Sequence, residues 1–184
     1  MIRTLLIAAL ATAGLVTSLA PRMAAAADDP RGDATSFTRE RQKAGLVGLD
    51  VDDPGSFEDS RRGFIAAPRG QIRDEQGKVV WDFQALAFTQ GEAPSTVNPS
   101  LWRQARLNHQ PGLYKVTEGI WQLRGFDLAN LTVIQGKTGW ILVDPLTTQE
   151  TAAAALAFAR QHLGAQPVTG VIFTHSHVDH FGGA

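Results

Sequence analysis

The chain has 184 residues, of which 43% are hydrophobic and 19% are charged, a composition that suits one globular domain plus an export segment. Its formal net charge of −1 excludes the strong positive charge typical of nucleic-acid-binding proteins. The absence of cysteine excludes disulfides, zinc ribbons and thiol nucleophiles together, and it leaves the redox compartment open.

Residues 1–27 have the order of a secretory signal peptide. Arg3 supplies the positive charge, residues 5–19 carry no charge, and residues 25–27 are three alanines that form a cleavage site before Asp28. A membrane anchor is the alternative, but this apolar segment is short for a bilayer span. We therefore expect cleavage, no stable membrane span, and a periplasmic or secreted mature protein.

Residues 28–111 predict an N-terminal extension that is mostly irregular or helical. A short helical turn is expected over residues 57–65, and apolar residues recur at helical spacing over residues 101–107. Between them, a turn leads into a predicted strand over residues 78–82. The extension offers few side chains that predict chemistry.

From residue 112 the pattern becomes that of a sheet. Short strands are predicted over residues 113–116, 120–123, 131–135 and 140–144. The last two strands are separated by four residues rich in glycine, which predicts a hairpin. We expect residues 112–184 to form the first part of a separate domain.

A crossover helix is predicted after the hairpin. Thr147 and Glu150 have the spacing of a capping box, and Gly164 is expected to end the helix. The helix has one apolar stripe, formed by Ala152, Ala155, Leu156, Ala159 and Leu163. A strand over residues 168–174 follows, so the fold class is α/β (α+β), with functional residues expected where strands end.

The last predicted strand leads into four metal-ligand types within six residues: His175, His177, Asp179 and His180. Imidazole and carboxylate groups bind zinc and similar divalent ions. His175 and His177 are two apart, so an extended backbone directs them to the same side. Burying such a cluster without partners is costly, so we predict a metal site instead of a packed core. A solvated chain end is the alternative.

Asp144 ends the strand before the crossover helix. It could accept a hydrogen bond from a ligand imidazole and so brace the metal loop. It could equally be a turn residue at the helix entry, and the sequence leaves both interpretations open.

Over most of residues 56–184, the chain resembles the bacterial alkyl sulfatases of the metallo-β-lactamase superfamily. The His-x-His-x-Asp-His spacing is typical of the superfamily as a whole. The narrower resemblance rests on Phe57-Glu58-Asp59, Arg62-Gly63-Phe64-Ile65, the segments 77–82, 119–125 and 139–146, and the distinctive block Asn98-Pro99-Ser100-Leu101-Trp102-Arg103-Gln104.

This resemblance implies an exported, homodimeric hydrolase that cleaves linear primary alkyl sulfate esters of the dodecyl sulfate type. It implies two zinc ions (Zn2+) per full-length subunit, with His175 and His177 on one ion and Asp179 and His180 on the other. The implied fold is an αββα sandwich, of which residues 112–184 are the first part, followed by a helical dimerisation region and a sterol-carrier-like domain.

Two zinc ions need more protein ligands than these four, and the family supplies further ligands at later positions. We therefore expect the 184-residue chain to be the amino-terminal part of a longer enzyme and to be inactive by itself. Two alternatives remain: another hydrolase of the superfamily, acting on a lactone, thioester or β-lactam, and a non-catalytic metal-binding protein. The block at residues 98–104 argues against the first.

Overall fold

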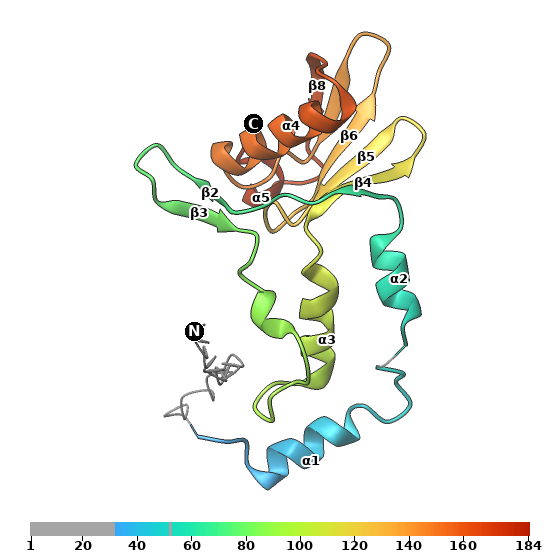
Figure 1. Cartoon of the computed structure of the whole chain (residues 1–184), viewed down its shortest axis with the longest axis vertical. Coiled ribbons are helices and arrows are strands. Elements are labelled where there is room, and N and C mark those ends of the chain that lie inside the picture. The colour runs from blue at the N-terminus through green and yellow to red at the C-terminus, as the bar shows by residue number, and fades with distance from the viewer. Residues whose placement is uncertain (1–31, 52) are drawn as a thin grey trace, which may run out of the picture. The chain divides into compact units, whose positions relative to one another are not determined.

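The strands of the described chain form a six-stranded sheet and a two-stranded hairpin (Figure 1). The computed structural model describes residues 32–51 and 53–184. The export segment predicted for residues 1–27 lies outside the described residues. Residues 34–184 cluster into one compact unit.

The six-stranded sheet contains all the strands predicted from residue 112 onward. In their order across the sheet, the strands are β1 (Phe64–Ala66), β4 (Gly112–Thr117), β5 (Ile120–Arg124), β6 (Leu131–Gln135), β7 (Trp140–Val143) and β8 (Val168–Ile172). Neighbouring strands are antiparallel except β7 and β8, which are parallel. A parallel pair needs a crossover connection, and α4 (Gln149–Leu163) supplies it. The carboxyl ends of β7 and β8 therefore meet at one end of the sheet, and the predicted α/β class is confirmed.

The N-terminal extension is helical and irregular, as predicted. It contains the helices α1 (Ser36–Ala44), α2 (Gly55–Arg61) and α3 (Pro99–Asn108), the short 3-10 helix η1 (Ala87–Thr89), and the hairpin of β2 (Gln71–Arg73) and β3 (Val79–Asp82). The extension also contributes β1 to the large sheet, and Trp81 Nε1 donates a hydrogen bond to the Gly125 carbonyl at 2.8 Å. The domain boundary at residue 111 stays a prediction.

The core lies between α4 and one face of the large sheet. Burial alternates along β6, where Leu131 and Val133 are fully buried, because successive strand residues point to opposite faces. The helix contributes Ala155 and Ala159, both without exposed surface. The apolar stripe predicted for the helix is its buried face, which packs in one core cluster with side chains of the large sheet and of β2.

The start of α4 differs by one residue from the prediction. The N-cap is Thr148, whose Oγ1 accepts from Thr151 N at 3.2 Å, while Thr151 Oγ1 accepts from Thr148 N at 3.3 Å. The capping box is therefore formed by two threonines and not by Thr147 with Glu150. The predicted end is confirmed, since Gly164 has a φ of 87°.

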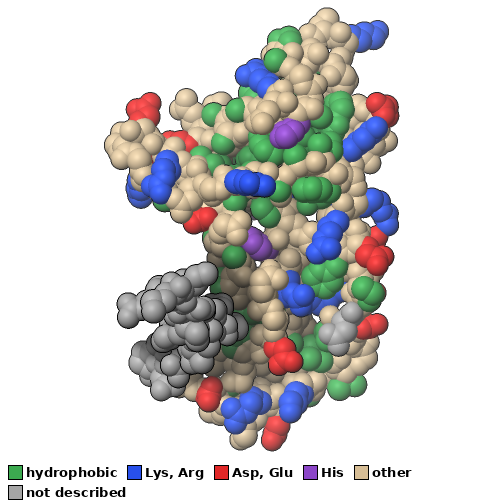
Figure 2. All heavy atoms as spheres, viewed as in Figure 1, with side chains coloured by type: hydrophobic (Ala, Val, Ile, Leu, Met, Phe, Trp, Pro, Cys, Tyr) green, Lys and Arg blue, Asp and Glu red, His purple; other side chains and the backbone are tan. Residues whose placement is uncertain are grey.

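The β8 side of the sheet exposes apolar side chains. Ile172, Phe173 and Phe181 are 50%, 49% and 42% exposed. On the face shown in Figure 2, hydrophobic side chains also gather over the part that contains the sheet and α4, with Lys and Arg around them. Among the helices of residues 32–51 and 53–184, none has the length and apolar character needed to cross a membrane.

Candidate metal centre

The candidate centre begins where β7 and β8 end side by side. Asp144 follows β7 directly, and its amide donates to the carbonyl of Ile172, the last residue of β8, at 2.9 Å. The backbone pairing thus continues one step beyond the strands. It places Asp144 beside Thr174, where the ligand-rich segment starts.

Asp144 is only 7% exposed and fastens the segment through its carboxylate. Oδ1 accepts from Thr174 N at 2.8 Å, and Oδ2 accepts from Thr174 Oγ1 at 2.7 Å. Oδ2 also lies 2.9 Å from Nδ1 of His180, on the short helix α5 (Val178–Phe181). Asp144 therefore joins both ends of the segment to β7, and it contacts a predicted ligand imidazole as one of the two sequence interpretations proposed.

The environment of Asp144 favours its ionised form. Burial alone opposes ionisation, but the two hydrogen bonds from Thr174 and the contact with His180 outweigh it and hold the pKa of the carboxyl below its ordinary value. An ionised Asp144 can only accept hydrogen bonds, so Nδ1 of His180 must carry the proton.

The four predicted ligands lie in two pairs. Nε2 of His175 and Nδ1 of His177 are 3.0 Å apart, and Nε2 of His180 lies 3.3 Å from Oδ2 of Asp179. The rings of His175 and His180 are also neighbours, with centroids 4.0 Å apart. The structure therefore brings all four residues together at the carboxyl end of β8.

The hydrogen bonds of Thr174 determine which ring nitrogens of His175 and His177 carry a proton. The single hydroxyl proton of Thr174 goes to Asp144, so Thr174 Oγ1 must accept from Nδ1 of His175, 3.0 Å away. In neutral His175, Nε2 then carries a lone pair, which accepts from Nδ1 of His177. Asp144 and Thr174 thus direct the lone pair of His175 away from the strands and toward the other imidazoles.

The second pair has two acceptors facing each other. Since Nδ1 of His180 carries the proton, Nε2 of the neutral ring presents a lone pair to the Asp179 carboxylate. A cation between the two atoms, either a proton or a metal ion, resolves this opposition.

The donor separations are compatible with metal ligation. Two ligand atoms about 2.05 Å from one tetrahedral zinc ion lie about 3.3 Å apart, close to the spacing in both pairs. In the first pair, ligation through Nδ1 of His177 requires that ring to carry its proton on Nε2 instead. Among residues 32–51 and 53–184, however, no three histidine or acidic residues are arranged as a group that could hold one ion. The donors therefore fit divalent metal in their chemistry and as pairs, and each pair leaves ligand positions to be filled.

Two glycines fix the segment against the loop that follows β7. A Cβ on Gly182 would lie 2.2 Å from the Thr147 carbonyl oxygen, and a Cβ on Gly183 would lie 2.2 Å from that of Pro145. Gly183 N also donates to Leu146 O at 3.1 Å. The glycines thus allow a close approach of two backbones, since Gly182 has the ordinary helical φ of −64°.

Asp127 is a supporting residue that sequence reasoning missed. It is 7% exposed, and its carboxylate accepts from the amide and hydroxyl of Thr147 at 3.0 and 2.7 Å and from Thr151 Oγ1 at 2.6 Å. It thereby holds the same loop that Gly182 and Gly183 contact. Asp127 lies in an irregular connection between two strands, and its partners are 20 and 24 residues away, so no local pattern indicates its role.

The two remaining histidines lie elsewhere. His109 is the C-terminal cap of α3, and His162 is near the end of α4, where its ring centroid lies 4.5 Å from that of Phe158. Neither is among the side chains that surround the candidate centre.

Comparison with known proteins places these residues in a family context. Residues 124–184 match the family model of the metallo-beta-lactamase superfamily. The chain is 44% identical over 176 residues to an (R)-specific secondary-alkylsulfatase of Pseudomonas sp, an alignment that covers 95% of this chain and 26% of that protein. It is 48% identical over 153 residues to a linear primary-alkylsulfatase of Pseudomonas sp, covering 82% of this chain and 23% of the relative.

A third relative is an alkyl/aryl-sulfatase of Saccharomyces cerevisiae, 43% identical over 166 residues, with 83% of this chain and 25% of the relative covered. The chain thus spans about a quarter of the length of the curated relatives it matches.

A solved structure supports the same placement. The stereoselective inverting sec-alkylsulfatase Pisa1 from Pseudomonas sp. superposes with a TM-score of 0.76 at 46% sequence identity, covering 82% of this chain and 24% of that one. Both the fold and the sequence are therefore shared with this enzyme over most of the chain. Residues 124–184 therefore form part of a metallo-beta-lactamase superfamily domain, and over most of its length the chain is a homologue of the alkylsulfatases.

Proposed function

We propose that the protein is a metal-dependent hydrolase of alkyl sulfate esters. The observation that carries this proposal is the arrangement of four possible metal ligands in two pairs, beside the carboxyl ends of β7 and β8. The relatives of the chain are named alkylsulfatases. Strand ends positioned by a packed sheet are where catalytic groups gather in such folds. The whole protein's activity, substrate and partners are part of this proposal.

The residues of this chain hold and orient ligands. His175 and His177 present one pair of donors, and Asp179 and His180 present the other. Asp144 accepts from Nδ1 of His180 and so keeps Nε2 available, as carboxylate partners do for ligand imidazoles. A metal ion bound there would lower the pKa of a bound water and stabilise charge that develops as the ester breaks.

The finer assignment is two zinc ions per full-length subunit and a linear primary alkyl sulfate as substrate. Histidine and carboxylate ligands suit zinc, and the donors form two pairs. The relatives named for primary and secondary alkyl sulfates are similar to this chain at 48% and 44% identity. A secondary alkyl sulfate is therefore the second candidate substrate.

Export and assembly complete the proposal. The order of charge, apolar residues and alanines in residues 1–27 supports a cleaved signal peptide and a periplasmic or secreted protein. We also propose a homodimer for the full-length protein, which the resemblance to the alkyl sulfatases implies.

The test is metal analysis and sulfate release on the protein at its native length. We expect about two zinc ions per subunit, turnover of dodecyl sulfate, and weaker turnover of 2-octyl sulfate. Loss of turnover on chelation and its return with zinc would support metal dependence.

Faster turnover of 2-octyl sulfate than of dodecyl sulfate would indicate that secondary alkyl sulfates are the substrates. Hydrolysis of a lactone or a β-lactam without sulfate release would contradict the alkylsulfatase assignment. Metal binding without any turnover would favour the non-catalytic alternative.

A further inference from the structure

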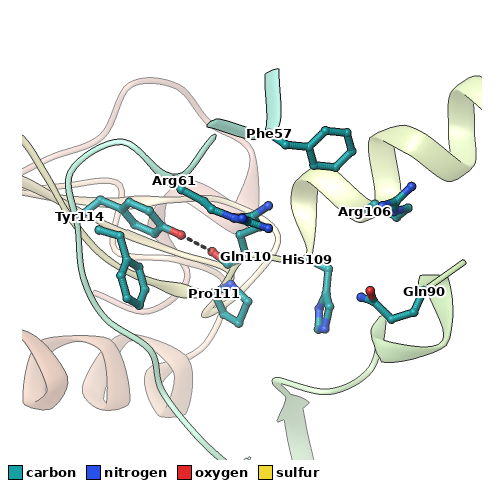
Figure 3. A pocket seen from close by; sticks show the side chains of 9 residues that line it. Phe57, Arg61, Gln90, Arg106, His109, Gln110, Pro111 and Tyr114 are labelled. Carbon is teal, nitrogen blue, oxygen red and sulfur yellow. Dashed lines mark hydrogen bonds between the residues drawn. The ribbon is translucent and has the colours of Figure 1, made fainter. Parts of the chain in front are cut away.

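A pocket lies at the edge of the sheet opposite to the donor pairs. It has a volume of about 350 Å³ and is formed by residues of α2, α3, β1 and the start of β4 (Figure 3). β1 is the edge strand of the sheet opposite to β8. The volume is in the range of small-molecule sites, and none of the predicted metal ligands lines it.

Two guanidinium groups line this pocket without acidic partners. Arg61 comes from α2 and Arg106 from α3, and no ion pair involves either one within the described residues. By contrast, the neighbouring Arg62 pairs with Asp59. The pocket therefore has two positive charges that are not neutralised by a contact with this part of the chain.

Both guanidinium groups are partly positioned. Arg61 Nε donates to Oε1 of Gln110 at 3.3 Å, which leaves its terminal nitrogens free to donate elsewhere. The guanidinium carbon of Arg106 lies 5.1 Å from the centroid of the Phe57 ring, in cation–π distance. Less side-chain entropy is then lost when such groups bind an anion.

The remaining walls are largely aromatic. Phe57, Phe64 and Tyr114 line the pocket, and the rings of Phe64 and Tyr114 meet edge to face with centroids 5.5 Å apart. Tyr114 is 1% exposed, and its hydroxyl already donates to the carbonyl of Gln110 at 2.9 Å, drawn as the dashed line in Figure 3. Phe57 and Phe64 therefore offer apolar surface beside the two charges, and the buried Tyr114 packs against Phe64.

We propose that this pocket binds a small organic anion whose oxoanion head contacts Arg61 and Arg106 and whose apolar part lies against Phe57 and Phe64. Guanidinium groups bind sulfonate, sulfate and carboxylate groups through two parallel hydrogen bonds. The aromatic rings favour such an anion over inorganic sulfate, because an apolar group there is removed from water. The proposal concerns a site separate from the metal centre and does not depend on hydrolysis.

The test is calorimetric titration of the protein at its native length with octane-1-sulfonate, which has no ester bond to hydrolyse. To exclude binding at the metal centre, the titration uses the His177→Ala variant. We expect binding that is about tenfold weaker in the double variant Arg61→Gln/Arg106→Gln, since each charge-assisted hydrogen bond contributes strongly. Arg62→Gln, the matched control with an exposed and already paired arginine, should bind like its parent.

Two further titrations define the ligand. Inorganic sulfate tests the head group alone, and octanoate tests whether a carboxylate replaces the sulfonate. Hydrogen exchange should slow in peptides covering residues 57–64 and 106–114 when octane-1-sulfonate is present.

Absence of octane-1-sulfonate binding, or equal binding in the double arginine variant, would overturn the proposal. Equal affinity for inorganic sulfate would also overturn it, since the aromatic walls would then contribute nothing. These results are independent of the proposed hydrolysis, because they are obtained in a variant that lacks a metal donor.

Discussion

The two edges of the six-stranded sheet differ in how their functional side chains are brought together. At the β8 edge, the four donors come from six consecutive residues, of which His175 and His177 are exposed and Asp179 and His180 are half-buried. At the β1 edge, the pocket brings Arg61 of α2 together with Arg106 and Tyr114, which lie 45 and 53 residues later in the chain. A local pattern can therefore reveal the first site, whereas the second exists only once the chain is folded.

The donor segment at the β8 edge is held in place by buried side chains outside it. The donors depend on two buried carboxylates, Asp144 and Asp127, which fasten the donor segment and the loop that it contacts. Changes to the donors should consequently affect ligation more than folding, and changes to the carboxylates should affect folding as well. Three variants test this division, and a fourth tests whether the two edges are independent.

The largest effect is expected from His175→Ala in the protein at its native length. Loss of one ligand should reduce kcat/KM for sulfate release by about 10³-fold, because metal stabilisation contributes several kcal/mol. The free energy of unfolding of the apo form should change little, since the side chain is exposed. Metal analysis, kinetics and urea unfolding measure these quantities. His162→Ala is the control. Unchanged metal content in His175→Ala would contradict the assignment of His175 as a ligand.

Asp127→Ala should have the next largest effect, and on stability. It leaves Thr147 and Thr151 without their buried acceptor, at a cost of about 3 kcal/mol in the free energy of unfolding. Urea unfolding of the apo form measures this loss. Asp59→Ala removes an exposed carboxylate and should change the free energy by less than about 0.5 kcal/mol. Equal effects of the two variants would refute a supporting role for Asp127.

Asp144→Asn should weaken metal binding by about 10- to 100-fold, the usual effect of removing the partner of a ligand imidazole. The amide keeps the size of the carboxylate but has no charge and only one acceptor oxygen. It therefore cannot accept all the hydrogen bonds that Thr174 and His180 donate to Asp144. Competition with a chelator measures the affinity. Glu118→Gln, whose side chain is 89% exposed, is the control. Unaltered affinity in Asp144→Asn would leave Asp144 with the other role considered for it, that of a turn residue at the helix entry.

Tyr114→Phe, at the opposite edge, should have the smallest effect. It removes the hydroxyl hydrogen bond to Gln110 and should cost about 1 kcal/mol in the free energy of unfolding at pH 8, measured in urea. Metal affinity should be unchanged, because β1 and β4 lie at the other edge of the sheet. A loss of metal affinity in this variant would show that the two edges are coupled.

Tyr114 also predicts a pH dependence. Burial raises the pKa of its hydroxyl, against the opposing charges of Arg124 and Arg61. Because the folded pKa is raised, this group's contribution to stability is fully present below its unfolded pKa of about 10 and is lost as the pH rises above that value. The loss of stability between pH 9 and 11 should therefore be smaller in Tyr114→Phe than in the parent. An identical loss in both proteins would contradict the assignment.

Much of the fold was predictable because it rests on local patterns. Short apolar segments predicted β6 and β7, and the four-residue glycine-rich loop between them predicted their hairpin. The helix that ends at Gly164 was recognised from its apolar stripe. The start of that helix was misplaced by one residue, because the choice between Thr147 and Thr148 depends on Asp127, which binds Thr147 from outside the helix. The helical turn predicted for residues 57–65 was wrong at its end, because α2 ends at Arg61 and Phe64–Ala66 form β1, a three-residue strand defined by its pairing with β4.

The sequence by itself determined which four residues could bind metal, because ligand chemistry and spacing are local properties. His175, His177, Asp179 and His180 lie within six consecutive residues, so they are close together in any fold. Only the tertiary structure decided what holds them. The parallel pairing of β7 with β8 places Asp144 beside Thr174, 30 residues later, and His180, 36 residues later. Such contacts depend on how the strands pair and on the loop closure that α4 provides, and no short stretch of sequence contains that information.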